Sequence, residues 1–450
     1  MGQLFGTDGI RGVANKDLTP ELALKAAKAT AFVLNKKLDR KAKILIGTDT
    51  RISADMLTEA MAAGFLAVGA DVYKLGVIPT PAIPILLKHY GADIGVMISA
   101  SHNPAKYNGI KLFDKNGFKL PDEVENEIEK SIFDGVIAES EDTGRVYEAF
   151  DSADIYAEAV RKIGMPEFSK PLKIFIDCAN GASAVTAKKI FAGINADIEF
   201  LNVEPDGKNI NKQCGSTNIA LLGEKVVKEK ADLGIAFDGD ADRCLICDEK
   251  GRILDGDRLI AAIALYLKSK GKLAGDMIAV TTMSNMGFIK YMKNHGVGSE
   301  LTRVGDRYVL EAMLKYGISI GGEQSGHIIL LDCNSTGDGE MTALFFLRVL
   351  AEGGRSAGDY YDDVAFYPQI SVNIKAENAV KDQLVCNETF TKEVELKRAL
   401  FGEKGRIIVR PSGTEPLVRI MVEGEYEALV KSVAGELLIL AEKIISTLES

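Results

Sequence analysis

The chain has 450 residues, of which 46% are hydrophobic and 26% charged, and its formal net charge is −10. This length is too great for one hydrophobic core and predicts several domains. The acidic balance argues against a nucleic-acid-binding protein, although a local cluster of Arg and Lys can still bind a phosphate.

No apolar run approaches the ~20 residues that span a bilayer, and the first residues lack the pattern of a secretory signal. The six cysteines are scattered and do not resemble a disulfide framework, which fits a reducing cytoplasm. Cys244 and Cys247 form a C-x-x-C inside an apolar run, without a second pair or a nearby His, and we interpret them as strand residues. We therefore expect a cytoplasmic protein that does not bind membranes.

As far as about residue 350, one unit occurs three times in chain order: a strand, a helix, a second strand, and a third strand that leads to a polar loop. First strands are expected at 43–46, 173–176 and 277–280, second strands at 69–72, 195–198 and 296–299, and third strands at 92–98, 231–237 and 317–320. This alternation is typical of parallel sheets covered by helices. It predicts three related α/β domains with mixed, mainly parallel sheets around a central cleft.

The pattern changes from about residue 368. Residues 369–374 alternate like a half-exposed strand, the runs 406–409 and 417–422 bracket a turn, and a helix is expected over 426–448. These elements predict an α+β domain with an antiparallel sheet. The expected domains are 1–152, 153–252, 253–367 and 368–450.

The first polar loop, residues 98–104 with the sequence ISASHNP, follows a buried apolar strand. Ser101 therefore lies at a strand's carboxyl end, where open α/β sheets place their ligands, although an ordinary exit from a strand would look the same. Lys111 is a candidate acid or base that could reach back to Ser101, the alternative being an exposed lysine. Arg11, in the Gly-rich stretch 5–12, is a candidate contact for phosphate or phosphoserine.

The second polar loop places Asp238, Asp240 and Asp242 within five residues, followed by Arg243. Unpaired carboxylates would repel one another there, and a hard divalent cation such as Mg²⁺ prefers oxygen ligands. The alternative is a solvated acidic turn, which is disfavoured because a buried strand leads straight into the loop. The sequence predicts a metal site.

The third polar loop, residues 321–327, has the sequence GGEQSGH. It combines a carboxylate, an amide, a hydroxyl and an imidazole between glycines: Glu323, Gln324, Ser325 and His327. Such a set suits recognition of a polyol or an amino sugar. Gly-rich polar loops without a ligand are also common, and this loop alone does not decide between the two.

A fourth loop, residues 410–416, has the sequence RPSGTEP. Arg410, the hydroxyls of Ser412 and Thr414, and the backbone N–H groups between them are the parts of a phosphate cradle, and Arg419 lies nearby in the sequence. The alternative is a hairpin loop whose hydroxyls cap their own backbone.

With these four loops in this order, the chain resembles the α-D-phosphohexomutase superfamily over essentially its whole length. Within that superfamily it is most similar to the members that act on glucosamine phosphates. The stretches that carry this similarity are 5–12, 98–104, 209–217, 304–309 and 336–339. Relatives that act on mannose and glucose phosphates usually have Met at the position of Gln324, and often Thr-Gly-His near residues 305–307.

The resemblance implies that Ser101 is a phosphoserine that gives its phosphoryl group to glucosamine 6-phosphate. The resulting 1,6-bisphosphate turns over, and Ser101 takes back the 6-phosphoryl group, leaving glucosamine 1-phosphate for amino-sugar nucleotides of the cell envelope. Lys111 and Arg243 would stabilise charge, and His102 would be a loop partner of Ser101. The implied Mg²⁺ ligands are Asp238, Asp240, Asp242 and a phosphate oxygen on Ser101. Glu323 and Ser325 would bind sugar hydroxyls, and the implied ligands of the non-reacting phosphate are Arg410, Ser412, Gly413 and Thr414.

Relatives are often dimers, so the resemblance also implies a homodimer. Three other hypotheses stay open: a mutase for mannose or glucose phosphates, a phosphatase or kinase-like enzyme phosphorylated on Asp238, and a sugar-phosphate sensor without turnover.

Overall fold

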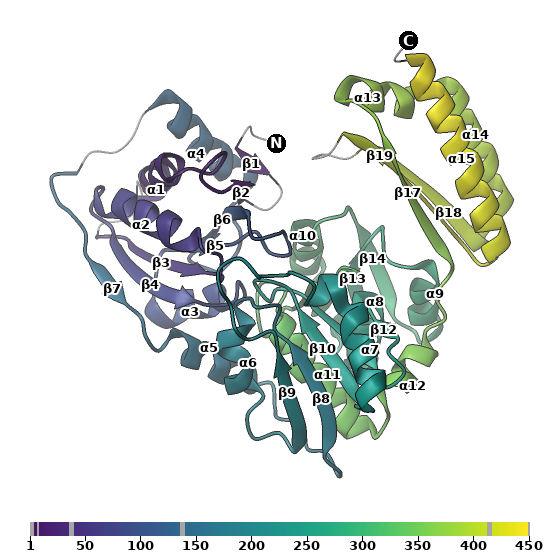
Figure 1. Ribbon diagram of the computed structural model, residues 1–450, viewed down its shortest axis with the longest axis horizontal. Helices are drawn as coiled ribbons and strands as arrows, with labels where there is room; N and C mark the ends of the chain where they lie inside the picture. The colour runs from purple at the N-terminus through teal and green to yellow at the C-terminus, as the bar shows by residue number, and fades with distance from the viewer. Residues whose placement is uncertain (1–3, 7–8, 36–39, 136–139, 412–415, 449–450) are drawn as a thin grey trace. The chain divides into compact units, whose positions relative to one another are not determined.

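The computed structural model describes residues 4–6, 9–35, 40–135, 140–411 and 416–448 (Figure 1). The chain forms two compact units, residues 1–283 with 295–363, and residues 284–294 with 364–450. None of the helices in the described ranges is long and apolar enough to cross a membrane.

The first sheet of the larger unit has seven strands in the order β1-β2-β6-β5-β3-β4-β7. Their bounds are β1 Phe5–Gly6, β2 Gly9–Val13, β3 Lys43–Thr48, β4 Asp71–Val77, β5 Ile94–Ile98, β6 Tyr107–Asp114 and β7 Val146–Glu148. The associated helices are α1 Pro20–Asn35, α2 Ala54–Leu66, α3 Ala82–Tyr90 and α4 Asp122–Asp134. Strands β5, β3, β4 and β7 run parallel, whereas β6 returns antiparallel to β5 and pairs with β2.

The strand β5 is buried along its whole length, which explains its continuous apolar run. Ile44, Val96 and Ile98 pack into a core with α1 and α2. The glycine at position 95 allows α3 to pack closely, because a Cβ there would lie 2.4 Å from Cγ2 of Ile83. The strand is thereby fixed between helices, and the loop that follows it is held in place.

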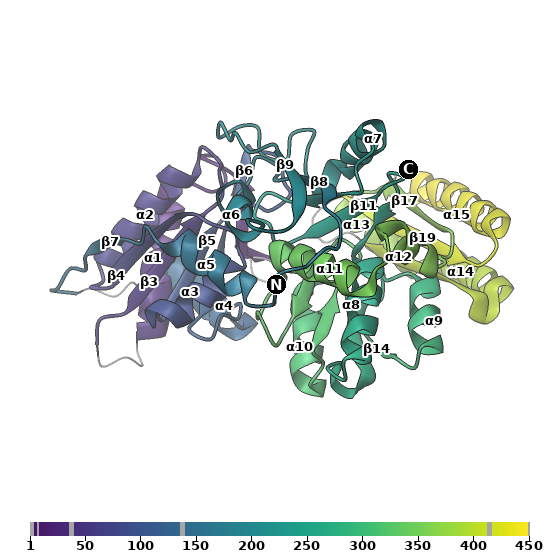
Figure 2. The same cartoon turned by 90° about the horizontal axis from the view of Figure 1, so that it is seen from below.

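The second and third sheets repeat this plan with fewer strands. The second sheet has the order β12-β11-β10-β8-β9 and the third the order β14-β13-β15-β16. The strands are β8 Leu172–Asp177, β9 Ala196–Leu201, β10 Leu233–Phe237, β11 Cys244–Asp248, β12 Ile253–Leu254, β13 Met277–Thr281, β14 Gly298–Thr302, β15 Ile320–Gly322 and β16 Ile328–Leu330. The helices of these two domains within the larger unit are α5 Ser152–Arg161, α6 Ser183–Ile190, α7 Ile219–Glu229, α8 Gly256–Ser269, α10 Asp306–Tyr316, α11 Gly339–Gly353 and α12 Ala357–Asp363. The helix α11 packs against both α5 and α8 (Figure 2).

Each sheet has the same hairpin-like feature beside its parallel core. The third parallel strand is followed by a polar loop and then by an antiparallel strand, as β5–β6, β10–β11 and β15–β16. The three candidate loops around Ser101, Asp238 and Glu323 are the connections of these pairs. Cys244 and Cys247 lie in β11, as expected.

The smaller unit contains an antiparallel sheet in the order β17-β19-β18. Its strands are β17 Gln369–Lys375, β18 Gly405–Pro411 and β19 Leu417–Gly424, and its helices are α9 Met286–Asn294, α13 Asn378–Cys386, α14 Glu388–Phe401 and α15 Glu427–Leu448. The segment that contains α9 is tied to this unit because Glu423 accepts a hydrogen bond from the Met286 N–H at 2.7 Å. The predicted fold class, three α/β domains and an α+β tail, is confirmed.

Candidate active site

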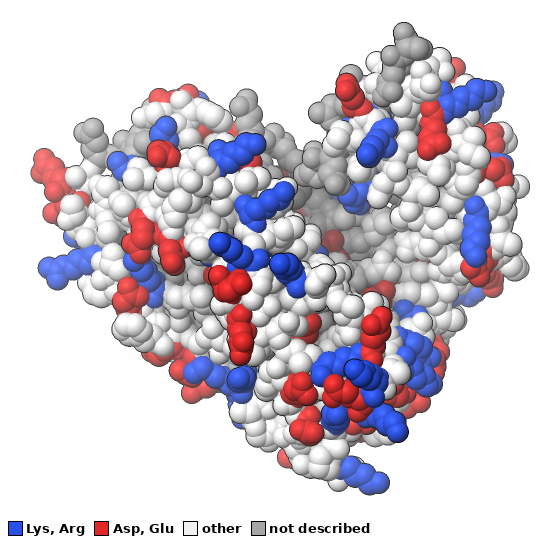
Figure 3. Space-filling model, in the orientation of Figure 1, with Lys and Arg blue, Asp and Glu red and all other residues white. Residues whose placement is uncertain are grey.

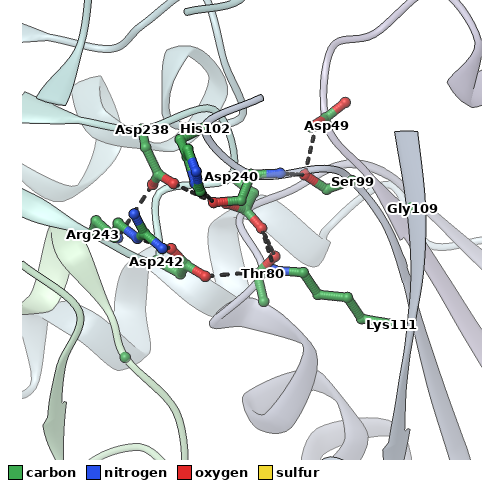
Figure 4. A network of polar contacts seen from close by, with 12 residues as sticks. Asp49, Thr80, Ser99, His102, Gly109, Lys111, Asp238, Asp240, Asp242 and Arg243 are labelled. Carbon is green, nitrogen blue, oxygen red and sulfur yellow. Dashed lines mark hydrogen bonds and ion pairs between the residues drawn. The ribbon is translucent and has the colours of Figure 1, made fainter. Parts of the chain in front are cut away.

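Ser101 lies in the loop after β5 and is buried. Its φ of 50° is in the left-handed region that few residues other than glycine adopt. Its backbone N–H donates to Oγ of Ser99 at 2.9 Å, and its own Oγ donates to Oδ2 of Asp238 at 2.6 Å. The serine hydroxyl therefore faces the second polar loop. Figure 4 shows the three carboxylates of that loop, Asp238, Asp240 and Asp242, together with Thr80 and Lys111.

Asp238, Asp240 and Asp242 are all buried, and one oxygen of each lies within 4.8 Å of the others. Oδ2 of Asp240 accepts hydrogen bonds from Thr80 at 2.5 Å and Lys111 at 2.8 Å. Oδ1 of Asp240 and Oδ1 of Asp242 are buried without a hydrogen-bond partner among the described residues. These oxygens fit a hard cation such as Mg²⁺, which prefers oxygen ligands.

The loop concentrates negative charge that its neighbours only partly offset. Burial, followed by the charges of Asp242 and Asp240, raises the pKa of Asp238 well above its ordinary value. Burial also opposes ionisation of Asp242, but Lys111, His327 and Arg243 together lower the pKa of this carboxyl. A divalent cation bound to these three carboxylates would offset the negative charge that Lys111, His327 and Arg243 leave uncompensated.

Lys111 is 2% exposed, so the alternative of an exposed lysine is wrong. It lies on β6 opposite Met97 of β5, and its Nζ reaches Oδ2 of Asp240 at 2.8 Å and Oδ2 of Asp242 at 3.5 Å. The lysine is therefore a fixed positive charge beside the metal loop, and β6 is the element that places it there.

His102 and two arginines lie around Ser101. Nδ1 of His102 is 3.3 Å from Oγ of Ser101. Burial, then the charges of Arg243 and Arg11, lower the pKa of His102 to about 4, so its ring is neutral at neutral pH. Arg11 lies on β2 opposite Gly109 of β6, and the backbone N–H of Arg243 donates to Oδ1 of Asp238 at 3.2 Å.

The third loop connects β15 to β16. Oε1 of Glu323 accepts from the N–H of Gly305 at 3.1 Å, whereas Oγ of Ser325 is buried without a hydrogen-bond partner among the described residues. The amide of Gln324 donates to Asp255 at 3.1 Å, at the N-terminus of α8. The hydroxyl of Ser325 could therefore bind a ligand, whereas the side chain of Gln324 holds the loop against the N-terminus of α8.

His327 is buried between the carboxylates of Asp242, in the metal loop, and Asp306, the first residue of α10. Nδ1 lies 3.7 Å from Oδ2 of Asp242, Nε2 lies 3.6 Å from Oδ2 of Asp306, and Nε2 accepts from the N–H of Gly337 at 3.1 Å. Burial lowers the pKa of His327, but the carboxylates of Asp242 and Asp306 raise it on balance. This histidine joins the third loop to the metal loop.

The fourth loop is only partly described. Arg410 on β18 and Arg419 on β19 are direct partners across the antiparallel pair in the smaller unit. Ser412, Gly413 and Thr414 lie outside the described residues.

Sequence reasoning missed several polar residues at other strand ends. Thr80 follows β4 and bonds to Asp240, and Asp49 and Arg51 follow β3 and surround the serine loop. The signal was present, because the carboxyl ends of β3 and β4 meet the same edge of the sheet as Ser101. Asn211, far away in the sequence, gave no such signal.

Comparison with known proteins agrees with this arrangement. Models for phosphoglucomutase/phosphomannomutase α/β/α domains I, II and III match residues 2–136, 154–251 and 255–367, and the model for the C-terminal domain matches residues 372–440. The chain belongs to the phosphoglucomutase/phosphomannomutase family. It is therefore a mutase, an isomerase, and the resemblance to phosphohexomutases is confirmed.

Relatives named phosphoglucosamine mutase are similar over the full length. That of Caldicellulosiruptor bescii is 49% identical and covers 100% of this chain and 99% of the relative. That of Caldanaerobacter subterraneus subsp. tengcongensis is 48% identical over 98% of this chain and 99% of the relative.

Solved structures share the fold at lower identity. A family protein from Burkholderia thailandensis matches with a TM-score of 0.80 and 22% identity, covering 98% of each chain. N-acetylphosphoglucosamine mutase of Aspergillus fumigatus, in complex with GlcNAc-6P and magnesium, matches with a TM-score of 0.65 and 17% identity, covering 98% of this chain and 96% of that one.

Proposed function

We propose that this chain is a Mg²⁺-dependent phosphoglucosamine mutase that interconverts glucosamine 6-phosphate and glucosamine 1-phosphate through a phosphoserine at Ser101. The observation that carries the proposal is the buried hydroxyl of Ser101, which donates at 2.6 Å to the first of three clustered carboxylates. Full-length relatives that are 48–49% identical and named for this reaction support the choice of substrate.

The reaction requires Ser101 to give and take a phosphoryl group. In the first half, the bond from Oγ to phosphorus breaks, the 1-hydroxyl of the sugar receives the phosphoryl group and loses its proton, and Oγ takes up a proton, which gives the 1,6-bisphosphate. In the second half, after the intermediate has turned over, the bond from O6 to phosphorus breaks and the phosphoryl group bonds to Oγ. O6 then takes up a proton, and the proton of Oγ must leave. Oδ2 of Asp238 already accepts that proton in a hydrogen bond, and the neutral ring of His102 lies 3.3 Å away.

Charge stabilisation comes from the groups around Oγ. Asp238, Asp240 and Asp242, with a phosphate oxygen on Ser101, would hold Mg²⁺, which neutralises charge on a transferring phosphoryl group. Lys111 and Arg243 hold positive charge beside the same carboxylates. Such fixed charges matter because phosphate-monoester reactions need accelerations of up to about 10²¹-fold.

The remaining residues are assigned as ligands within this proposal. Glu323 and Ser325 would bind sugar hydroxyls. His327, in the same loop, would assist them while its ring contacts Asp242 of the metal loop. The arginines Arg410 and Arg419, with residues 412–414, would bind the non-reacting phosphate. The four domains are proposed at 1–152, 153–252, 253–367 and 368–450, each carrying one loop.

Three further parts of the proposal concern the activator, the assembly and the location. A sugar 1,6-bisphosphate would serve as activator and intermediate, and a variant of the A. fumigatus enzyme was solved with glucose 1,6-bisphosphate. A cytoplasmic location and a homodimer are proposed with it.

The test compares kcat/KM for the 6-phosphates of glucosamine, mannose and glucose, with Mg²⁺ and a small amount of sugar bisphosphate. The highest value is expected for glucosamine 6-phosphate, with lower activity on the others, because one substituent at C2 gives modest discrimination. A higher value for mannose or glucose would contradict the substrate. No turnover of any of the three would contradict the mutase.

A further inference from the structure

One guanidinium group binds several backbone carbonyls of the serine loop and of the residues that follow it. Nη2 of Arg51 donates to the carbonyls of Ser101 at 2.8 Å and Asn103 at 2.7 Å. Nη1 donates to the carbonyls of Pro104 at 2.6 Å and Tyr107 at 3.0 Å. Four carbonyls on a seven-residue stretch are thus held by one planar group.

Arg51 is itself fixed from the other side. The side chains of Arg51 and Asp49 are 0% exposed, and Nε donates to Oδ2 of Asp49 at 2.8 Å. The same Oδ2 accepts from Oγ of Ser99 at 2.6 Å, and Oγ of Ser99 accepts from the N–H of Ser101 at 2.9 Å. A continuous chain of hydrogen bonds through Arg51, Asp49 and Ser99 therefore links the carbonyl of Ser101 to its own N–H.

A second domain of the larger unit binds the same loop. Nδ2 of Asn211, in the connection between β9 and α7, donates to the carbonyl of Ser101 at 2.9 Å and to that of Asn103 at 3.3 Å. The metal loop lies directly against both, because a Cβ at Gly239 would be 2.6 Å from the Ser101 carbonyl oxygen and 2.8 Å from Nδ2 of Asn211. The serine loop is thus held from two domains where it meets the carboxylates.

We propose that Arg51 and Asn211 are positioning residues that hold the Ser101 loop in the geometry needed for phosphoryl transfer. The inference rests on the proposed role of Ser101 as the phosphoryl carrier. Ser101 adopts a sparsely populated backbone conformation, which persists only where its surroundings hold it. Because Oγ is both donor and acceptor of the phosphoryl group in each turnover, a displacement of about 1 Å would cost about 10²-fold in rate.

The test replaces Arg51 by Lys, which keeps the charge but cannot present the planar fork that reaches four carbonyls. The control is Arg161→Lys, because Nη1 of Arg161 donates to three carbonyls at the end of α6, those of Lys189, Ile190 and Ala192. Both variants lose a backbone-binding guanidinium, but only Arg51 touches the serine loop.

Three quantities are measured for each: kcat, KM for glucosamine 6-phosphate, and the rate at which glucose 1,6-bisphosphate phosphorylates Ser101, followed by intact mass. For Arg51→Lys we expect kcat and the phosphorylation rate to fall about 10²-fold, with KM within about twofold of wild type. For Arg161→Lys both rates should stay within about twofold. A purely structural role would lower the fraction of enzyme that can be phosphorylated but leave kcat per phosphorylated site unchanged, and that result would overturn the proposal.

Asn211→Ala is the second variant, and it tests the positioning role even if Arg51→Lys does not fold. This variant should lower kcat about tenfold, a smaller loss than for Arg51→Lys, because the contacts of Arg51 with the serine loop remain. An unchanged kcat would overturn the inference. If the wild-type enzyme shows no mutase activity, the proposed function fails, whereas an active wild type with an unaffected Arg51→Lys variant refutes the positioning role alone.

Discussion

Replacing Lys111 by Met should destabilise the fold in a way that depends on Mg²⁺. The ammonium group is buried and lies 2.8 Å from Asp240 and 3.5 Å from Asp242. Removing one partner of a buried ion pair typically costs about 3–5 kcal/mol, because the remaining charge is left uncompensated. In EDTA, we therefore expect the free energy of unfolding to fall by about 3–5 kcal/mol.

Saturating Mg²⁺ should reduce this loss. A ligand at 100 times its Kd stabilises the native state by about 2.7 kcal/mol. The ion should bind the Lys111→Met variant more tightly than wild type, because the ammonium no longer repels it or occupies Oδ2 of Asp240. Urea unfolding of both proteins, in EDTA and in millimolar Mg²⁺, measures the difference.

The control is Lys189→Met, whose ammonium forms a largely exposed pair with Asp154. Such pairs contribute about 0–1 kcal/mol, and the loss should be the same with and without Mg²⁺. If Lys111→Met loses the same free energy in both conditions, Lys111 and the cation do not share these carboxylates. If the variant loses no free energy of unfolding in either condition, the buried ion pair of Lys111 with Asp240 does not stabilise the fold.

Three further variants test other parts of the structure. Burial raises the pKa of Asp338 to about 6, so this carboxyl loses its proton at lower pH in the unfolded state than in the native state. The free energy of unfolding should therefore fall by up to about 3 kcal/mol as pH rises from about 4 to 6. Urea unfolding of Asp338→Asn should lack this fall, and a variant whose free energy of unfolding falls with pH as the wild type's does would contradict the prediction. Gly239→Ala should lower kcat by about 10²-fold, since its Cβ would meet the Ser101 carbonyl at 2.6 Å, and a wild-type rate would disprove that approach. Thr80→Val removes the 2.5 Å hydrogen bond to Asp240 and should lower the free energy of unfolding in EDTA by about 1.5–3 kcal/mol, whereas an unchanged midpoint would show that the bond contributes nothing.

The parallel strands were predictable because burial on both faces leaves continuous apolar runs. β5 and β10 are buried at every residue, and the expected runs end where the strands end, at Ile98 and Phe237. The third repeat was shifted, since β15 begins at Ile320 rather than Gly317. Gly317 instead caps α10 in the left-handed conformation, with φ of 66°.

Of the antiparallel return strands, β11 was expected from the apolar run that contains Cys244 and Cys247, whereas β6 was harder to predict. β6 contains the buried polar residues Asn108 and Lys111, which hide its burial from a pattern of apolar residues. In the smaller unit, α13 and α14 were not anticipated, although the three strands and the final helix were close to their observed bounds.

The carboxylate cluster could be predicted because all of its members lie in one loop. The contact of Lys111 with this cluster and that of Asn211 with Ser101 could not, since each joins segments that are distant in the sequence. Lys111 and Asp240 are 129 residues apart in the sequence, and Asn211 and Ser101 are 110 apart. Ser101 and Asp238 both follow the third strand of their units, but Asp238 directly follows β10 whereas Ser101 comes three residues after β5 ends.

The most direct test of the account is to locate the phosphoryl group on the enzyme. The protein is incubated with glucose 1,6-bisphosphate and Mg²⁺, and its peptides are mapped by mass spectrometry. We predict an acid-stable phosphate on Ser101 that is absent from Ser101→Ala and is transferred to added glucosamine 6-phosphate. An acid-labile phosphate on Asp238 that persists in Ser101→Ala would contradict the account.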